Sequence, residues 1–329
     1  MKSILKKTYS VLITTLFVVL VTSFSFSPLN ETGNKTASIT STTFAKNSLN
    51  FIIVSDWGWN GFKHQQEVAD QMAKSADSIH SQYIVSCGDN FQINGVASIT
   101  DPLWISNFEN IYKEPSLLVD WFPVLGNHDY KGNSQAEIDY SHVSRRWRLL
   151  DRNYTIVKKV NDSISARLIF IDTSPFIDEY RTNPEVFPDL LQQDTTKEIN
   201  WLRNVLENAH EKWIFVFGHH PICTATHYGS IKEMNAHIKP LLEKYHVQCY
   251  FCGHNHNLQH LHEKGKQIDY FITGTGGECY PPADRNESTL FSKLEPAFSI
   301  VSLHADSLSF CFVNTKGTII YRYSRSTKN

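Results

Sequence analysis

The stretch Phe51-Ile-Ile-Val-Ser-Asp-Trp-Gly58 joins a short apolar run to an acidic residue and a glycine. Both faces of the run 51–55 are apolar, which is typical of a strand buried on both sides of a sheet. Open α/β sheets bind their ligands just beyond the carboxyl ends of such strands. The stretch therefore predicts a buried strand that places Asp56 at the edge where a site can form.

The same arrangement recurs along the chain, because short apolar runs alternate with segments of helical period. Val68, Met72 and Ile79 mark one face of a helix that follows the first strand. Further strands are predicted at 83–87, 121–125, 153–159, 166–172, 213–217 and 248–252. Two more helices are predicted, one at about 194–210 and one whose inward residues are Met234, Ile238, Leu241 and Tyr245.

Beyond residue 270 the helical pattern stops and strands follow one another, at 270–273, 298–303, 308–313 and 318–323. Strand–helix alternation followed by such a run of strands predicts a single α/β domain with mixed sheets. We place this domain at residues 50–325. The segments 178–193 and 278–296 have no clear pattern and are expected to be loops near the site.

The composition is that of an ordinary globular protein. The chain has 329 residues, of which 41% are hydrophobic and 19% are charged, which is enough to bury a sizeable core. Its formal net charge of −2 gives no field that would attract a polyanion. Nucleic acid is therefore not expected as a partner.

The N-terminal segment differs from the rest of the chain. An apolar run from Val11 to about Phe26 follows three lysines, Lys2, Lys6 and Lys7. A charged start and a short apolar run predict a signal peptide at 1–27, followed by a polar linker at 28–49. The alternative is an uncleaved N-terminal membrane anchor. In both cases the domain is expected outside the cytosol, secreted or periplasmic.

Export would permit disulfides, and the chain has six cysteines. Several lie in apolar runs, where a cysteine often acts as a small buried hydrophobic residue. Cys223 and Cys279, both in predicted loops, are the pair to test first.

Residues of metal-binding type follow five of the predicted strands. They are Asp56, Asp89, Asn127 with His128, His219 with His220, and His254 with His256. Each alone has an ordinary explanation as a cap or turn residue. Together, carboxylate, amide and imidazole groups suit iron, zinc or manganese. His254 and His256 are two apart in what should be an extended segment, so they are expected to project on the same side.

Four of these motifs have a specific order. They are Gly88-Asp-Asn-Phe91, Gly126-Asn-His-Asp129, Gly218-His-His-Pro221 and Gly253-His-Asn-His256. With Asp56-Trp-Gly58 before them, they resemble the calcineurin-like metallophosphoesterases, and most closely the small tartrate-resistant purple acid phosphatases. The resemblance covers about residues 50–325. It implies a mixed-sheet β-sandwich flanked by helices and an exported phosphatase with two metal ions.

The resemblance also implies a role for each motif residue. Asp56, Asp89 and His256 would bind the first metal, and Asp89, Asn127, His219 and His254 the second, with Asp89 as the bridge. His128 and His227 would be catalytic. Asn90 and His220 would contact the substrate.

One position departs from the purple enzymes. In the purple enzymes, the motif that corresponds to the one beginning at Gly88 has a tyrosine at its fifth position. The tyrosinate binds the ferric ion. This chain has Gln92 instead. The Gln92 amide oxygen or an extra water could fill the vacancy, but neither supplies the charge of a phenolate. We expect a more exchangeable first metal and no purple colour.

By resemblance, the reaction is the hydrolysis of a small phosphate monoester through attack by a metal-bound hydroxide, with His128 assisting the leaving group. Two alternatives remain at this point. The same centre could hydrolyse phosphodiesters or nucleotides, since the pocket walls decide that choice. The chain could also be a catalytically weak protein that binds metal or phosphate.

Overall fold

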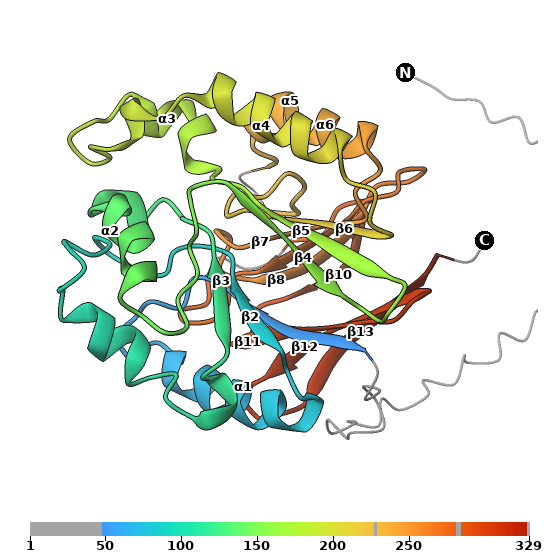
Figure 1. Cartoon of the computed structure of the whole chain (residues 1–329), viewed down its shortest axis with the longest axis horizontal. Coiled ribbons are helices and arrows are strands. Elements are labelled where there is room, and N and C mark those ends of the chain that lie inside the picture. The colour runs from blue at the N-terminus through green and yellow to red at the C-terminus, as the bar shows by residue number, and fades with distance from the viewer. Residues whose placement is uncertain (1–47, 227–228, 281–283, 328–329) are drawn as a thin grey trace, which may run out of the picture. The chain divides into compact units, whose positions relative to one another are not determined.

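The computed structural model describes residues 48–226, 229–280 and 284–327. Within this part of the chain, two β-sheets pack face to face and helices cover their outer faces (Figure 1). α1 covers one sheet, and α4, α5 and α6 cover the other. The domain is therefore a mixed-sheet β-sandwich flanked by helices, and the predicted fold class is confirmed.

The first sheet has six strands in the order β13-β12-β11-β1-β2-β3. Three of them are parallel: β1 (Leu49–Val54), β2 (Tyr83–Ser86) and β3 (Asp120–Pro123). The others run antiparallel to their neighbours: β11 (Ala297–Leu303), β12 (Ser307–Asn314) and β13 (Ile319–Ser326). The stretch Leu49–Val54 is buried throughout, as its apolar faces predicted.

The second sheet has seven strands in the order β10-β8-β9-β7-β6-β5-β4. Its parallel centre is β5 (Ser165–Phe170), β6 (Trp213–Phe217), β7 (Cys249–Cys252) and β9 (Asp269–Thr273). The antiparallel strands are β4 (Tyr154–Lys159), β8 (Leu258–His262) and β10 (Thr289–Lys293). The carboxyl ends of the parallel strands carry the loops of the motifs.

The helices are α1 (Gln65–Ile79), α2 (Ser134–Asp139), α3 (Asp178–Arg181), α4 (Thr195–Glu207), α5 (Lys232–His237) and α6 (Lys239–Lys244). α1 buries Val68, Met72 and Ile79, as the period predicted. Asp194 caps α4 by accepting the backbone N–H of Thr196 at 3.0 Å and of Lys197 at 3.1 Å.

The helix predicted around 234–245 is two helices, α5 and α6, separated at Ile238. Pro240 explains the break, because it has no N–H to donate and fits only the first turn of the second helix. Leu242 of the second helix is fully buried. Leu241 and Tyr245, which were predicted to face inward, are partly buried and pack against the core.

β8 and β10 were also not predicted. β10 lies inside the segment 278–296 that was expected to be a loop. β10 lies at the edge of its sheet, and most of its residues are only half-buried. Its sequence therefore lacks the apolar alternation that identifies a strand.

A buried carboxylate joins the two sheets. Asp269 of β9 is fully buried, and its Oδ2 accepts hydrogen bonds of 2.9 Å from Tyr323 and Arg325 of β13. Its Oδ1 lies 3.1 Å from His260 Nε2 and 2.9 Å from His262 Nδ1 on β8. Charged hydrogen bonds of this kind are the stronger ones, so Asp269 is expected to hold β13 against the second sheet.

All six cysteines lie in the described residues and are free thiols, so Cys223 and Cys279 are not paired. β1 begins at Leu49, and the domain bounds 50–325 stay a prediction. The predicted signal peptide and nearly all of the linker lie outside the described residues. None of the helices between residues 48 and 327 that the structure describes has the length and hydrophobicity needed to cross a membrane.

Candidate metal centre

Six side chains from five strand ends converge where the two sheets meet. Asp56, Asp89 and Asn127 follow β1, β2 and β3, and His219 follows β6, while His254 and His256 follow β7. Hydrogen bonds connect the loops of the two sheets, as two examples show. The His254 backbone N–H donates to Asp56 Oδ2 at 3.0 Å, and His219 Nδ1 lies 2.9 Å from the Cys87 carbonyl.

The backbone at these loops is unusual. Asp56, Asp89 and His254 have φ values of 58°, 49° and 67°, in the left-handed region that residues other than glycine rarely adopt. Such strain persists only where the surroundings enforce it, and it is concentrated at functional sites. His254 is therefore not in an extended segment. The prediction that an extended segment places His254 and His256 on the same side was wrong.

Two glycines allow the close approach of the loops. A Cβ atom on Gly126 would lie 2.2 Å from Asp89 Oδ1, and one on Gly253 would lie 2.3 Å from Asp56 Oδ2. Any other residue would push a carboxylate out of the site. These glycines are thus needed for packing against the carboxylates.

The first group of converging atoms surrounds the Asn127 amide oxygen. Asn127 Oδ1 lies 3.1 Å from His219 Nε2 and 3.0 Å from His254 Nδ1. His219 Nε2 also lies 3.4 Å from Asp89 Oδ1. Four donor atoms of the types that bind borderline divalent metals therefore face one point.

The second group consists of Asp56, Asp89 and His256. His256 Nε2 lies 3.4 Å from Asp56 Oδ1. Ligand atoms of Asp56, Asp89 and His219 all lie within 4.8 Å of one another, so the two groups are continuous.

The outer nitrogens of two histidines support metal binding. His219 Nδ1 faces the Cys87 carbonyl, and His256 Nδ1 faces the Glu278 carbonyl, both at 2.9 Å. A carbonyl only accepts, so each neutral ring carries its proton on Nδ1 and presents the Nε2 lone pair to the centre. This is the outer-shell arrangement that orients metal-binding histidines, and the residues therefore fit a cation.

Electrostatics without an ion are dominated by the two aspartates. Burial raises the pKa of Asp56 to about 6, although His256 and His219 act against it. Burial also acts on Asp89, but His219 and His128 overcome it and hold the Asp89 pKa well below its usual value. Burial alone would lower the pKa of His219. The negative charge of Asp89 outweighs burial and raises this pKa to about 9. Asp89 and His219 thus stabilise each other's charged forms.

Gln92 is buried beside this group. Its Nε2 lies 3.5 Å from Asp89 Oδ2, at the limit of a hydrogen bond. The side chain is thus close enough to the predicted first metal to take part in its surroundings.

His128 is half-buried at the entrance to the centre. Its backbone N–H donates to Asp89 Oδ1 at 2.9 Å, and its ring Nε2 lies 4.0 Å from Asp89 Oδ2. Its Nδ1 lies 3.3 Å from both Lys131 Nζ and the Ile93 carbonyl. Burial lowers the His128 pKa, with Asp89 opposing. His227 lies outside the described residues.

Asn90 does not face the site. Its Oδ1 accepts from Ser86 Oγ at 2.6 Å, and its Nδ2 donates to the Val124 carbonyl at 2.9 Å and to Glu137 Oε2 at 3.0 Å. The side chain is fully buried. The expected contact of Asn90 with phosphate is therefore corrected to a role in holding the β2 and β3 loops.

His220 lies beside the centre, with a ring nitrogen within 4.8 Å of ligand atoms of His219 and His254, but both of its ring nitrogens have protein partners. Thr173 Oγ accepts the backbone N–H groups of His219 at 3.2 Å and His220 at 3.0 Å, so its own proton goes to His220 Nδ1, 2.8 Å away. His220 Nε2 then donates to Tyr180 Oη at 3.2 Å. Burial, with His254 adding to it, lowers the His220 pKa well below its usual value. The buried neutral ring supports the His219 loop and the α3 segment.

Asp129 has a positioning role that the sequence did not reveal, although it belongs to the third motif. Its carboxylate accepts backbone N–H groups from Asn90 at 3.2 Å, Phe91 at 2.9 Å and Gly126 at 2.8 Å. It therefore ties the Asp89 loop to the Asn127 loop. Tyr280, which no motif marks, covers His256 with ring centroids 4.4 Å apart.

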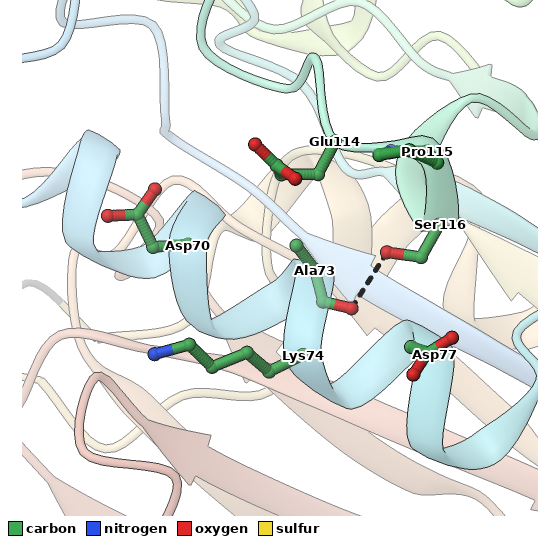
Figure 2. A pocket seen from close by; sticks show the side chains of 7 residues that line it. All are labelled: Asp70, Ala73, Lys74, Asp77, Glu114, Pro115 and Ser116. Atoms are coloured by element: carbon green, nitrogen blue, oxygen red, sulfur yellow. Dashed lines mark hydrogen bonds between the residues drawn. The ribbon is translucent and has the colours of Figure 1, made fainter.

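A hollow of about 500 Å³ between α1 and the turn Pro115–Leu117 is separate from these loops (Figure 2). Its charged lining residues are Asp70, Lys74, Asp77 and Glu114, and Ser116 Oγ donates to the Ala73 carbonyl at 2.8 Å. None of its lining residues is a histidine. The hollow therefore does not resemble the metal centre.

Comparisons with known proteins indicate a family for the chain. A model of the calcineurin-like phosphoesterases matches residues 49–258. Purple acid phosphatase 3 of Arabidopsis thaliana is 31% identical over 293 residues, which cover 85% of this chain and 78% of that protein. Tartrate-resistant acid phosphatase type 5 of Oryctolagus cuniculus is 31% identical over 251 residues, which cover 73% of this chain and 77% of that protein.

Among solved structures, GAP50, the anchor in the inner membrane complex of Plasmodium, is similar with a TM-score of 0.76. The match covers 86% of this chain and 90% of that one, at 23% identity. At this identity the likeness shows the fold alone.

Proposed function

Because this chain belongs to the calcineurin-like phosphoesterases and has purple acid phosphatases among its homologues, we propose that it hydrolyses phosphate monoesters at a dinuclear metal centre. The family makes it a phosphate-ester hydrolase. The observation that carries the finer proposal is the convergence of six ligand-type side chains from five strand ends. The charged and apolar N-terminal run supports export of the enzyme.

We assign the two ions, of iron, zinc or manganese, to the two groups of converging atoms. Asp56 and His256 belong to the first ion, and Asn127, His219 and His254 to the second. Asp89 lies between the groups and is assigned as the bridge, which its contact with His219 and its place near Asp56 support. When bound, the ions would polarise the phosphoryl group and lower the pKa of a water at the site.

His128 is assigned to proton transfer at the leaving oxygen. Lys131 Nζ can only donate to His128 Nδ1, so it favours the tautomer with the proton on Nε2, the nitrogen that faces Asp89. The Ile93 carbonyl can only accept from Nδ1, so it favours the other tautomer. Both tautomers have a partner, so the ring can hold or release a proton at Nε2. His227 is proposed as a second histidine near the substrate on the resemblance alone.

Replacing His128 with alanine is expected to lower kcat for a phosphate monoester roughly 10²- to 10³-fold, because general acid catalysis contributes in this range. Metal content should stay at the wild-type level, since His128 is not assigned as a ligand. Rates and elemental analysis of the same preparations check this. His142→Ala, at an exposed histidine outside the centre, is the matched control. An unchanged rate in His128→Ala would remove this residue from the mechanism.

Parallel assays on a monoester and a diester decide the substrate class. We expect a higher kcat/KM for the monoester, with both activities lost in Asn127→Ala because the Asn127 oxygen lies at the centre of one ligand group. A preference for the diester or a nucleotide would favour the alternative hydrolase. Stoichiometric metal without turnover of either substrate would favour a binding protein.

The iron-loaded protein is expected to lack a visible charge-transfer band, because Gln92 offers no phenolate beside Asp89. Gln92→Tyr should gain such a band if Gln92 lies beside the first ion. Absorption spectra of both proteins at equal iron content provide the measurement. A band in the wild-type protein would show that another residue supplies the phenolate.

A further inference from the structure

An apolar groove of about 570 Å³ opens beside the metal centre. We call it the Trp59–Ile93 groove. It lies between the loop after β1 and the loop after β2, and its lining includes Trp59, Phe62, Phe91, Gln92 and Ile93. Phe62 is 72% exposed and Ile93 is 63% exposed, which is unusual for large apolar side chains. Clustered exposure of this kind often marks a binding surface.

One side of the groove is continuous with the catalytic groups. Gln92 lines the groove and also reaches Asp89, with 3.5 Å between Nε2 and Oδ2. Ile93 lines it too, and its carbonyl lies 3.3 Å from His128 Nδ1. A molecule whose phosphate binds at the metal centre beside His128 would thus have this wall next to its ester oxygen.

The other side is continuous with the first metal group. Lys63 Nζ pairs with Glu278 Oε1 at 2.6 Å, and the Glu278 carbonyl holds His256 Nδ1 at 2.9 Å. The Trp59 indole packs on Gly277, where a Cβ atom would lie 2.8 Å from Trp59 Nε1 and 2.9 Å from the Asp56 carbonyl. Residues on both sides of the groove therefore contact residues next to the centre.

Ile93 is held in a strained conformation. Its φ of 73° is an outlier for a β-branched residue. The neighbouring bonds enforce it, because Gln92 N–H donates to the Gly58 carbonyl at 3.0 Å and Asn94 N–H to the Gln92 carbonyl at 3.1 Å. The chain thus keeps an unfavourable backbone that presents an apolar side chain to solvent beside His128, and a functional reason is expected.

We propose that the Trp59–Ile93 groove binds the organic part of the substrate, and that the enzyme selects phosphate monoesters of aryl alcohols. Trp59 and Phe62 offer aromatic surface, and Ile93 offers an aliphatic edge beside the ester oxygen. This inference rests on the proposed phosphatase function.

The test compares phenylphosphonate with methylphosphonate, which share a head group and differ only in the organic part. Calorimetric binding to the metal-loaded full chain is expected to be roughly 10- to 50-fold tighter for phenylphosphonate, the range for apolar groups in a pocket. Phe62→Ser and Ile93→Asn should each lower this ratio about fivefold or more. Leu118→Ser, at an apolar side chain of similar exposure outside the groove, should leave the ratio unchanged.

A second readout does not depend on binding. Asparagine tolerates positive φ better than isoleucine, so Ile93→Asn should raise Tm by roughly 2–4 °C while it lowers the ratio. A lower Tm would contradict the strain argument. Equal binding of the two phosphonates, or a ratio that both groove variants leave unchanged, would overturn the groove assignment while the phosphatase proposal stands. If neither phosphonate binds, the phosphatase proposal fails as well.

Discussion

Replacing Asp89 with asparagine is expected to lower kcat/KM for a phosphate monoester by about 10³-fold or more, which corresponds to about 4 kcal/mol of lost transition-state stabilisation. The substitution keeps the size of the side chain and an oxygen that can accept the His128 backbone N–H. It removes the negative charge that faces His219 at 3.4 Å and that we assign to both ions. The loss of charge should weaken both metal sites together.

Rates and metal content of the Asp89→Asn protein check this result, with circular dichroism to show that it is folded. The control is Asp139→Asn, at an exposed carboxylate on α2. That variant should retain wild-type rate and metal content. An Asp89→Asn protein that keeps both ions and a near-normal rate would refute the assignment of Asp89 as the bridge.

Replacing Asp269 with asparagine is expected to lower the free energy of unfolding by about 2–4 kcal/mol, because it removes one partner from a buried charged network. Asp269 is fully buried and contacts His260, Tyr323 and Arg325. The variant would leave Arg325 without its carboxylate and would loosen β13 from the second sheet.

The pH dependence of this loss has a defined sign. Burial would raise the Asp269 pKa, but hydrogen bonds from His260 and Tyr323 and the charge of Arg325 hold it below 3.8. A depressed pKa stabilises the folded state above the unfolded-state pKa, and this stabilisation disappears as pH falls through the folded-state value. The difference between wild type and Asp269→Asn should therefore be full at neutral pH and shrink only below about pH 4.

Urea unfolding at several pH values measures this difference. Lys266→Gln, which breaks an exposed ion pair with Glu243, should leave the stability unchanged and is the control. An Asp269→Asn protein as stable as wild type would show that the network does not hold the sheets together.

The central elements of the fold could be predicted from the sequence because their patterns are local. The apolar run 51–55 and the period of Val68, Met72 and Ile79 each contain enough information to identify a strand and a helix. Pro240 marks the break in the sequence too, but the apolar period that runs across it favours a single helix. β10 could not be recognised, because its pairing with β8 depends on tertiary contacts.

The site could be predicted in part for the same reason. Asp56, Asp89 and His219 follow clear strands, and parallel strands bring their ends to one edge. By contrast, nothing local separates Asn90, which points inward to Glu137, from a residue that faces the substrate. The Trp59–Ile93 groove is formed by loops that lie far apart in sequence, so it is visible only in the folded chain.

The central claim is that these residues form a dinuclear metal centre. Elemental analysis of the full chain, purified from its own source without chelators, tests it most directly. The wild-type protein should contain about two metal ions per chain, and Asp89→Asn far fewer, as expected for a centre with a shared ligand. A folded wild-type protein that contains no stoichiometric metal, and that hydrolyses a monoester equally well with a chelator present, would contradict the claim.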